Sequence, residues 1–92
     1  MAANVRGEVV WDPVHQVGYL TLEGLEPNAE SGRQYQLWIF DGTRDDRYPV
    51  DGGVFDVPHG SGTVTVPIRP ALRVAQAVAF AITLEPAGGV VV

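Results

Sequence analysis

Four aspartates on one connection are the residues of this 92-residue chain whose chemistry is easiest to name. They lie in the segment DGTRDDRYPVDGG, residues 41–53, at Asp41, Asp45, Asp46 and Asp51. Carboxylate oxygens on a loop suit Ca²⁺, so a calcium site is one hypothesis. Their spacing departs from the EF-hand pattern, however, and Arg44 and Arg47 supply internal counter-charges. A solvated loop whose charges pair with one another is therefore the favoured interpretation, with no metal and no cofactor expected.

The same connection is long enough to be a recognition loop for a partner. Binding residues often lie on such loops, because a rigid scaffold presents them. The residues that would make this contact are Asp41, Arg44, Asp45, Asp46, Arg47, Tyr48 and Asp51.

Catalytic side chains are few in this sequence. Histidines occur only in two predicted turns, at His15 and His59, and a zinc site would need carboxylate help to reach three or four ligands. Ser31 and Ser61 are the serines, and neither lies in a nucleophile elbow, which needs a strand-to-helix turn. We therefore expect exposed turn histidines and a protein that is not an enzyme.

Trp11 and Trp38 are open to two interpretations. Exposed aromatic rings on a sheet are one way to hold a sugar ring, by stacking and apolar contact. A small domain, on the other hand, has few other means of burying as much apolar area. We favour packing for both, more firmly for Trp38, because an edge strand leaves an aromatic residue such as Trp11 more exposed.

Composition and charge exclude several kinds of function. The chain has no cysteine, so disulfides and thiolate metal sites are excluded. Its net charge is −5, and its six basic residues are all arginines scattered along the chain. Nucleic-acid binding needs clustered positive charge, so no nucleic-acid partner is expected.

Glycine and proline punctuate the chain at short intervals, and runs rich in β-branched and aromatic residues lie between them. No window supports a helix longer than one turn, and the best candidate is residues 70–74. The pattern predicts an all-β fold, an antiparallel β-sandwich of six to eight short strands, with a closed barrel as the second choice. The predicted strands are residues 6–11, 18–23, 34–41, 53–57 (a weaker prediction), 62–68 and 75–84.

Three of these strands carry more specific predictions. In QYQLWIFDG, residues 34–42, both faces are largely apolar, which indicates a strand covered on both sides. The run from 75 to 84 alternates large residues with alanines and threonine, and we expect it to be central and covered on both faces as well. Pro67 removes a hydrogen-bond donor, so its strand should lie at an edge or contain a bulge.

The length suits a single domain, residues 1–92. No apolar run approaches the ~20 residues that cross a bilayer, and the start MAANVRG lacks the features of a signal peptide. The strand pattern meets both ends abruptly. We therefore expect a domain excised from a longer protein.

Five segments, taken in order, resemble the C-terminal domain of anti-sigma-K factors of the RskA type. They are GEVVWDP, GYLTLEGLEP, YQLWIFDG, VDGGVFDV and AVAFAITLEPAGG, and they are spread over residues 7–89. The most specific pieces are YQLW at residues 35–38, the preceding Gly24 and Leu25, and LEPAGG at residues 84–89. We expect the residues at the motif positions to have structural rather than catalytic roles. These residues are Trp11, Tyr35, Leu37, Trp38, Leu84, Glu85, Pro86, Gly88 and Gly89.

The resemblance implies a regulatory role with no catalytic residues. Proteins of this family typically join a cytoplasmic segment that holds a sigma factor inactive, one membrane-spanning helix, and a β-rich domain on the outer side of the bacterial membrane. This chain resembles only that last part. It would be the sensing end of a system in which a membrane protease releases the sigma factor. The sigma factor and the membrane would be reached only through parts of the protein outside this chain. The alternative is a small cell-envelope binding module for a glycan or a protein.

Overall fold

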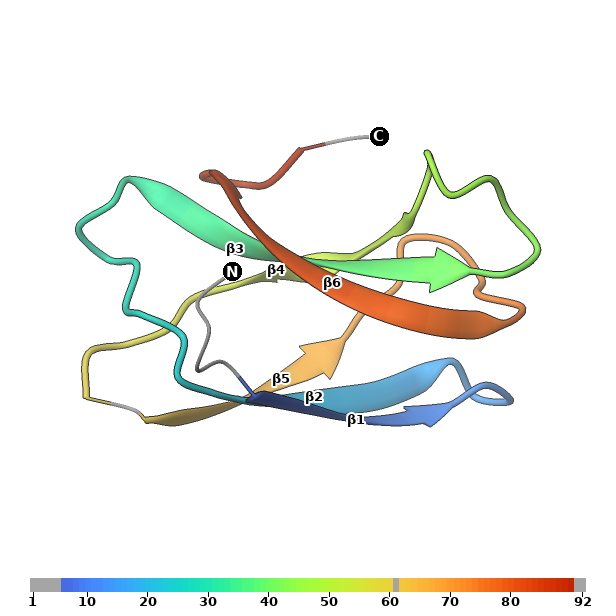
Figure 1. Ribbon diagram of the computed structural model, residues 1–92, viewed down its shortest axis with the longest axis horizontal. Helices are drawn as coiled ribbons and strands as arrows, with labels where there is room; N and C mark the ends of the chain where they lie inside the picture. Colours follow the sequence, from blue (N-terminus) through green and yellow to red (C-terminus); the bar gives the residue numbers. More distant parts are fainter. Residues whose placement is uncertain (1–5, 61, 91–92) are drawn as a thin grey trace.

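The computed structural model describes residues 6–60 and 62–90, and within them the chain forms six strands and no helix. The strands form two three-stranded antiparallel sheets, β1–β2–β5 and β4–β3–β6, which lie face to face (Figure 1). The predicted all-β sandwich is confirmed. The strands are β1 (Arg6–Asp12), β2 (Val17–Glu23), β3 (Arg33–Asp41), β4 (Val50–Phe55), β5 (Thr63–Ile68) and β6 (Ala77–Pro86).

The core lies between the two sheets and follows the period of two. Leu20 and Leu22 point inward from β2, and Leu37 and Ile39 from β3, and all four are buried. The rings of Tyr35 and Phe55 stack across β3 and β4 with centroids 5.5 Å apart. Burial of these alternate side chains is the main force that holds the sheets together.

The centre of the second sheet is β3, which is covered on both sides as its sequence predicts. Its inner face carries Leu37 and Ile39, and its outer face carries Gln36 and Trp38, with exposed fractions of 0% and 6%. The five consecutive residues from 35 to 39 are all buried. An antiparallel strand with no wet face needs a second layer over its outer side, which here includes residues 88–90.

The prediction that the last strand is central is wrong. β6 pairs only with β3 and forms an edge of its sheet, and Val78 is 59% exposed. The alanines that suggested a covered face have another role. Ala79 and Ala81 are the register partners of Phe40 and Trp38, so they leave room for large rings on the neighbouring strand.

The edge position predicted from Pro67 is confirmed, because β5 is an edge strand of the first sheet. The other edge of that sheet is β1, where Trp11 pairs with Gly18. A Cβ built on Gly18 would collide with the Val10 carbonyl oxygen and lie 3.2 Å from the Trp11 ring. Glycine at this position therefore lets the indole lie against the backbone of β2.

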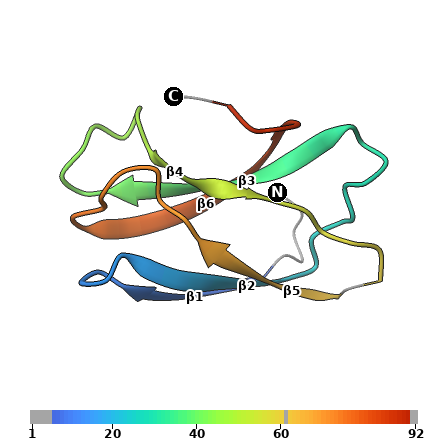
Figure 2. The ribbon, with the colours of Figure 1, turned by 180° about the vertical axis from the view of Figure 1, so that it is seen from behind.

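The two sides of the sandwich differ. On one side the segment after β5 bonds to β4, through Arg69 N–H to the Gly52 carbonyl (2.9 Å) and Ala71 N–H to the Asp51 carbonyl (2.8 Å), as the view from behind helps to follow (Figure 2). On the other side the edges of β1 and β6 flank an apolar groove of about 190 Å³. It is lined by Gly7, Val9, Leu20, Leu22, Phe80, Ala81 and Ile82.

Candidate functional site: the β3–β4 loop

The loop of residues 42–49 lies at one end of the molecule. The β1–β2 turn and residues 69–76 lie at this end too, whereas β1 starts in the other half of the molecule, where the β2–β3 and β4–β5 loops form the opposite end (Figure 1). The longest dimension of the fold is 36 Å. The loop is therefore separated from the first described residue by about the length of β1.

Asp41, the last residue of β3, anchors this loop to the β5–β6 connection. Its carboxylate is buried and accepts hydrogen bonds from Thr43 N–H (2.9 Å), the Thr43 hydroxyl (2.7 Å), Ala75 N–H (2.8 Å) and Gln76 N–H (3.2 Å). The bonds from Thr43, followed by those from Ala75 and Gln76, lower the pKa of Asp41 to about 2 although burial opposes this. Asp41 is therefore a charged clasp between two connections.

The outer part of the loop is a compact exposed group. The Arg47 guanidinium donates to the Asp45 carboxylate, with Nη2 2.8 Å from Oδ2, and it lies 5.8 Å from the centre of the Tyr48 ring. The side-chain bond from Arg47 lowers the pKa of Asp45, and the pKa of Arg47 is raised in turn. Tyr48 N–H donates to the Asp45 carbonyl, and the Tyr48 side chain is exposed. A cation and an aromatic ring are thus presented together on a turn held by Asp45.

The four aspartates proposed as calcium ligands do not converge. Asp41 is enclosed by N–H and O–H donors, Asp45 is paired with Arg47, and Asp51 accepts from Gly53 N–H (2.8 Å). Asp46 is exposed. Within residues 6–60 and 62–90, no three His, Cys, Asp or Glu side chains form a group that could hold a metal ion.

The histidines and the described serine serve local contacts. His15 Nδ1 lies 2.7 Å from Asp12 Oδ2 in the β1–β2 turn, which lowers the pKa of Asp12, and His59 Nε2 lies 3.5 Å from Glu30 Oε1 in the loops at the other end. The Ser31 hydroxyl donates to the Asn28 carbonyl and accepts from Arg33 N–H. Ser61, the other serine considered as a nucleophile, lies outside the described residues.

Both tryptophans pack rather than form a platform. The Trp38 indole N–H donates to the Thr83 hydroxyl at 2.8 Å. Trp11 is half-buried and packs against the core, and its indole N–H is enclosed with no hydrogen-bond partner in the part of the chain that the structure describes. The two indoles therefore differ in whether their polar atom is satisfied.

Two amide side chains that sequence reasoning missed also hold the end loops together. Asn28 is buried, accepts from Val57 N–H (2.7 Å) and donates to the Arg33 carbonyl (2.8 Å) and the Asp56 carboxylate (2.9 Å). Gln16 accepts from Val74 N–H (2.7 Å) and donates to the Val74 carbonyl (2.8 Å). Each amide satisfies backbone groups of a distant segment, and nothing local in the sequence marks such a partner.

An exposed apolar row crosses the outer face of the first sheet. Val10, Tyr19 and Pro67 are aligned across β1, β2 and β5 by the strand register, and Val10 and Tyr19 are 65% and 58% exposed. Thr21 and Thr65 form a neighbouring polar row, with their hydroxyl oxygens 3.5 Å apart. Tyr19 is thus an exposed aromatic ring on the sheet face, at a position that the sequence analysis did not single out.

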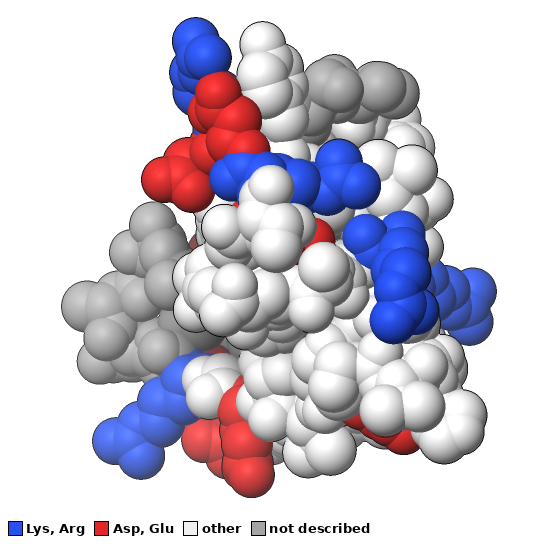
Figure 3. Space-filling model, turned by 90° about the vertical axis from the view of Figure 1, so that its right-hand side faces the viewer, with Lys and Arg blue, Asp and Glu red and all other residues white. Residues whose placement is uncertain are grey.

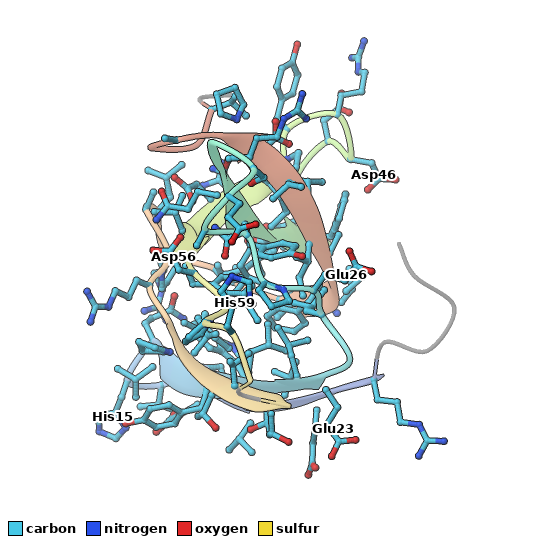
Figure 4. All side chains as sticks on the ribbon, turned by 90° about the vertical axis from the view of Figure 1, so that its left-hand side faces the viewer. His15, Glu23, Glu26, Asp46, Asp56 and His59 are labelled. Atoms are coloured by element: carbon cyan, nitrogen blue, oxygen red, sulfur yellow. The ribbon has the colours of Figure 1, made fainter. Side chains whose placement is uncertain are left out.

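The charges are divided between the two ends. The end that carries the β3–β4 loop, viewed in Figure 3, has both arginines and carboxylates on its surface. From the chain order its charged residues are Arg44, Arg47, Arg69 and Arg73, against Asp12, Asp41, Asp45, Asp46 and Asp51. The opposite end, viewed in Figure 4 with Glu23, Glu26, Asp56 and His59 labelled, is acidic. Its carboxylates are Glu23, Glu26, Glu30, Asp56 and Glu85, against Arg6 and Arg33. The β3–β4 loop therefore lies at the end where arginines nearly balance carboxylates, and more of the excess negative charge lies at the opposite end.

Comparison with known proteins gives one match. The family described as "Anti-sigma-K factor rskA, C-terminal" matches residues 1–91, almost the whole chain. No curated protein and no solved structure matches. Among the described residues, no helix is long and apolar enough to cross a membrane.

Proposed function

Because the chain belongs to the family of anti-sigma-K factor RskA C-terminal domains, we propose that it is the extracytoplasmic regulatory domain of a membrane-anchored anti-sigma factor. Membership supports a regulatory role, and the partner of an anti-sigma factor is a sigma factor. The finer proposal is that this domain senses a signal or controls access of a protease to the protein, and that it has no catalytic role. A membrane protease would act on the protein when the domain binds a partner or opens.

The family match over residues 1–91 carries this proposal. The architecture supports it, because β1 runs toward the end of the fold where the loop of residues 42–49 lies, so the first described residue lies away from that loop (Figure 1). A membrane helix placed before β1 would leave that loop as the part farthest from the bilayer. A partner in the cell envelope would then meet the loop first.

Such a domain can work without a pocket. Proteolysis of a folded protein tracks the population of its open form when opening and closing are fast. A small domain of ordinary marginal stability therefore converts a change in its folding free energy into a change in cleavage. Contact with the loop can alter that free energy, because Asp41 connects the loop to the end of the β5–β6 connection, next to the buried Val74.

We propose the exposed Arg47–Tyr48 pair and Asp46 as the centre of the contact surface, with Arg44 and Asp45 beside them and Asp41 and Asp51 as the supports of the loop. Arginine and tyrosine are enriched at the centres of protein interfaces. The turn that carries them is held by Asp45 in one conformation, which lowers the entropy cost of binding.

The side of the membrane is testable because the chain contains no cysteine. Asp46→Cys in the full-length protein places one exposed thiol on the loop. A membrane-impermeant maleimide should label it in intact cells, with the unsubstituted full-length protein as the matched control. Labelling of Asp46→Cys only after the cells are permeabilised would overturn the extracytoplasmic placement.

The regulatory role is testable with a reporter that depends on the sigma factor. Arg47→Ala with Tyr48→Ala in the full-length protein should change induction of the reporter without lowering the Tm of the purified domain. Glu30→Ala with His59→Ala, a second exposed pair at the opposite end, is the control. Equal induction in the loop variant, the control and the parent protein would argue against the loop as the contact.

A second candidate function rests on the exposed Tyr19 row. Because Trp11 and Trp38 pack, a glycan or a protein of the cell envelope would bind instead over Val10, Tyr19 and Pro67, with the Thr21–Thr65 row as hydrogen-bonding neighbours. Stacking of a sugar on Tyr19 predicts that peptidoglycan fragments shift the NMR signals of the Tyr19 ring. The glycan version of this candidate would be excluded if the Tyr19 signals did not shift at millimolar concentrations of the fragments. It would also be excluded if the signals of the neighbouring residues shifted equally in the parent protein and in Tyr19→Ala.

A further inference from the structure

Residues 87–90, here called the strap, fold back over the outer face of β3. Gly88 N–H donates to the Gln34 side-chain oxygen (3.1 Å), Val90 N–H donates to the Gln36 side-chain oxygen (2.9 Å), and the Gln36 amide nitrogen donates to the Val90 carbonyl (3.0 Å). Gln36 therefore pairs with both backbone groups of Val90, as a neighbouring strand would. Figure 1 shows the C-terminal segment passing above β3.

Two glycines let the strap lie this close. Gly88 and Gly89 have φ angles of +90° and +79°, in the region that favours glycine, and Gly89 N–H closes a turn onto the Pro86 carbonyl (2.9 Å). A Cβ at Gly89 would lie 2.8 Å from Val54 Cγ1 and 2.9 Å from the Gln36 side-chain oxygen. The GG of LEPAGG thus fits a requirement for close approach to β3 and β4.

The strap is attached more weakly than the strands. Its bonds to β3 run through side chains rather than through a backbone ladder, and Val90 is partly exposed. Opening it would expose the Gln36 amide to water, which can replace both lost hydrogen bonds. The inner face of β3, with Leu37 and Ile39, would stay buried against the first sheet. Segments with few buried contacts open at lower free energy than the core.

From this we infer that the strap is a latch that opens independently of the sandwich and uncovers the outer face of β3. In its closed state it occupies a binding position for an extended chain, built from Gln34, Gln36 and the side of Val54. The link to regulation rests on the proposed function above: an opened latch is an unpaired segment that a protease or a partner can capture. The opening itself is a property of the domain alone.

Amide hydrogen exchange of the purified intact chain, followed by NMR, tests the latch separately from any role in cells. In the parent protein the amides of Gly88 and Val90 should exchange roughly 100-fold or more faster than those of Leu37 and Ile39, because the latch opens without global unfolding. Gln36→Leu keeps the approximate volume and removes both bonds to Val90. It should raise the exchange rate of the Val90 amide by roughly tenfold.

Gln16→Asn is the control at the other end, since Gln16 makes the same two-bond pairing with Val74, besides a bond to the Pro13 carbonyl, and asparagine tolerates its φ of +56° while its shorter side chain weakens the pairing. It should raise exchange at Val74 and leave Val90 unchanged. Gly89→Ala is a second variant at the chain's periphery, and it should accelerate Gly88 and Val90 while the amides of β3 keep their rates. The latch is overturned if Val90 exchanges at the rate of Leu37 and Ile39, or if Gln36→Leu and Gly89→Ala leave its rate unchanged. Neither result would bear on the family assignment or on the cysteine-labelling test.

Discussion

The carboxylate of Asp41 accepts a 2.8 Å hydrogen bond from the backbone N–H of Ala75, which lies 34 positions further along the chain. Asp41 is at the end of β3, and Ala75 lies just before β6. Two strands that are neighbours in the sheet are thus joined a second time, beyond their ladder. The same carboxylate also fixes the first turn of the β3–β4 loop through Thr43.

Removal of this clasp should be costly. Asp41→Ala leaves the N–H groups of Thr43, Ala75 and Gln76 without their acceptor at a buried position. We expect the Tm to fall by about 10 °C, a large effect for a single substitution in a domain of this size. Asp46→Ala, an exposed aspartate in the same loop, is the control and should change the Tm by about 1 °C at most. Equal melting of Asp41→Ala and the parent protein would contradict the clasp.

Acid should weaken the clasp in a defined pH window. The pKa of Asp41 is lowered from its usual 3.8 to about 2 in the folded state, so its contribution to stability is complete above about pH 4 and is lost as the pH falls through about 2. Between these values the free energy of unfolding, measured with urea, should decrease with falling pH. Asp41→Asn should show a shallower decrease than Asp46→Asn. The same slope in both variants would mean that another group dominates acid unfolding.

The two tryptophans should respond differently to loss of the indole nitrogen. Trp38→Phe breaks the bond to Thr83, whereas Trp11→Phe removes an N–H that has no partner among the described residues. We expect Trp38→Phe to destabilise the domain by about 1 kcal/mol more than Trp11→Phe. In a double-mutant cycle, Thr83→Val should be costly with Trp38 present and nearly neutral in the Trp38→Phe background. Additive costs would show that the bond contributes nothing.

Asn28 should be among the most sensitive polar positions. Asn28→Ala leaves Val57 N–H and the Arg33 carbonyl without their side-chain partner and removes one of two side-chain donors to the Asp56 carboxylate, the other being Gln34. A loss of about 3 kcal/mol in the free energy of unfolding is expected from denaturation with urea. Ala29→Ser at the exposed neighbouring position is the control. If Asn28→Ala lowered the free energy of unfolding by less than about 0.5 kcal/mol, these hydrogen bonds would not contribute measurably to the stability of the fold.

Calcium should have no effect on thermal unfolding. Asp41, Asp45 and Asp51 already accept hydrogen bonds from protein donors, so a calcium ion would have to displace those donors. The Tm in millimolar calcium should equal the Tm in a chelator within about 1 °C, because a ligand stabilises only what it binds. If calcium raised the Tm of the parent protein but not that of Asp45→Asn, the calcium hypothesis would be restored.

Local pattern was sufficient for the existence of the six strands and for the two-sided burial of β3, because both depend on the alternation of side chains within a few residues. The bounds of the weakest predicted strand, residues 53–57, were wrong, since β4 is Val50–Phe55 and Asp51 lies on that strand rather than on the connection. It failed for β6, where alanines indicated a covered strand. Their actual setting, beside Trp38 and Phe40 on β3, is a relation between strands 40 or so positions apart. Small residues in a strand are found both where another layer covers the strand and where the neighbouring strand carries large side chains. The sequence of one strand does not distinguish these two cases.

The candidate site divides in the same way. The sequence indicated that charges within the loop pair with each other, and the Asp45–Arg47 contact shows this. The contacts of Asp41 could not be predicted in this way, since its four hydrogen-bond donors come from two segments and only Thr43 is nearby in sequence. Gln16 and Gln36 were missed for this reason also. An amide that pairs with distant backbone is chemically ordinary until the fold brings its partner to it.

The burial of β3 on both faces bears on how this domain can diverge over evolutionary time. Each of the five residues from Tyr35 to Ile39 is enclosed by other parts of the chain, so a change at any one of them needs a compensating change elsewhere. Residues along the open sides of edge strands such as β1 and β6 can change without a compensating change elsewhere. Sequences that descend from a common ancestor should therefore keep YQLW long after their loops have become unrecognisable. The core strand of the second sheet would then serve as the family's most durable signature.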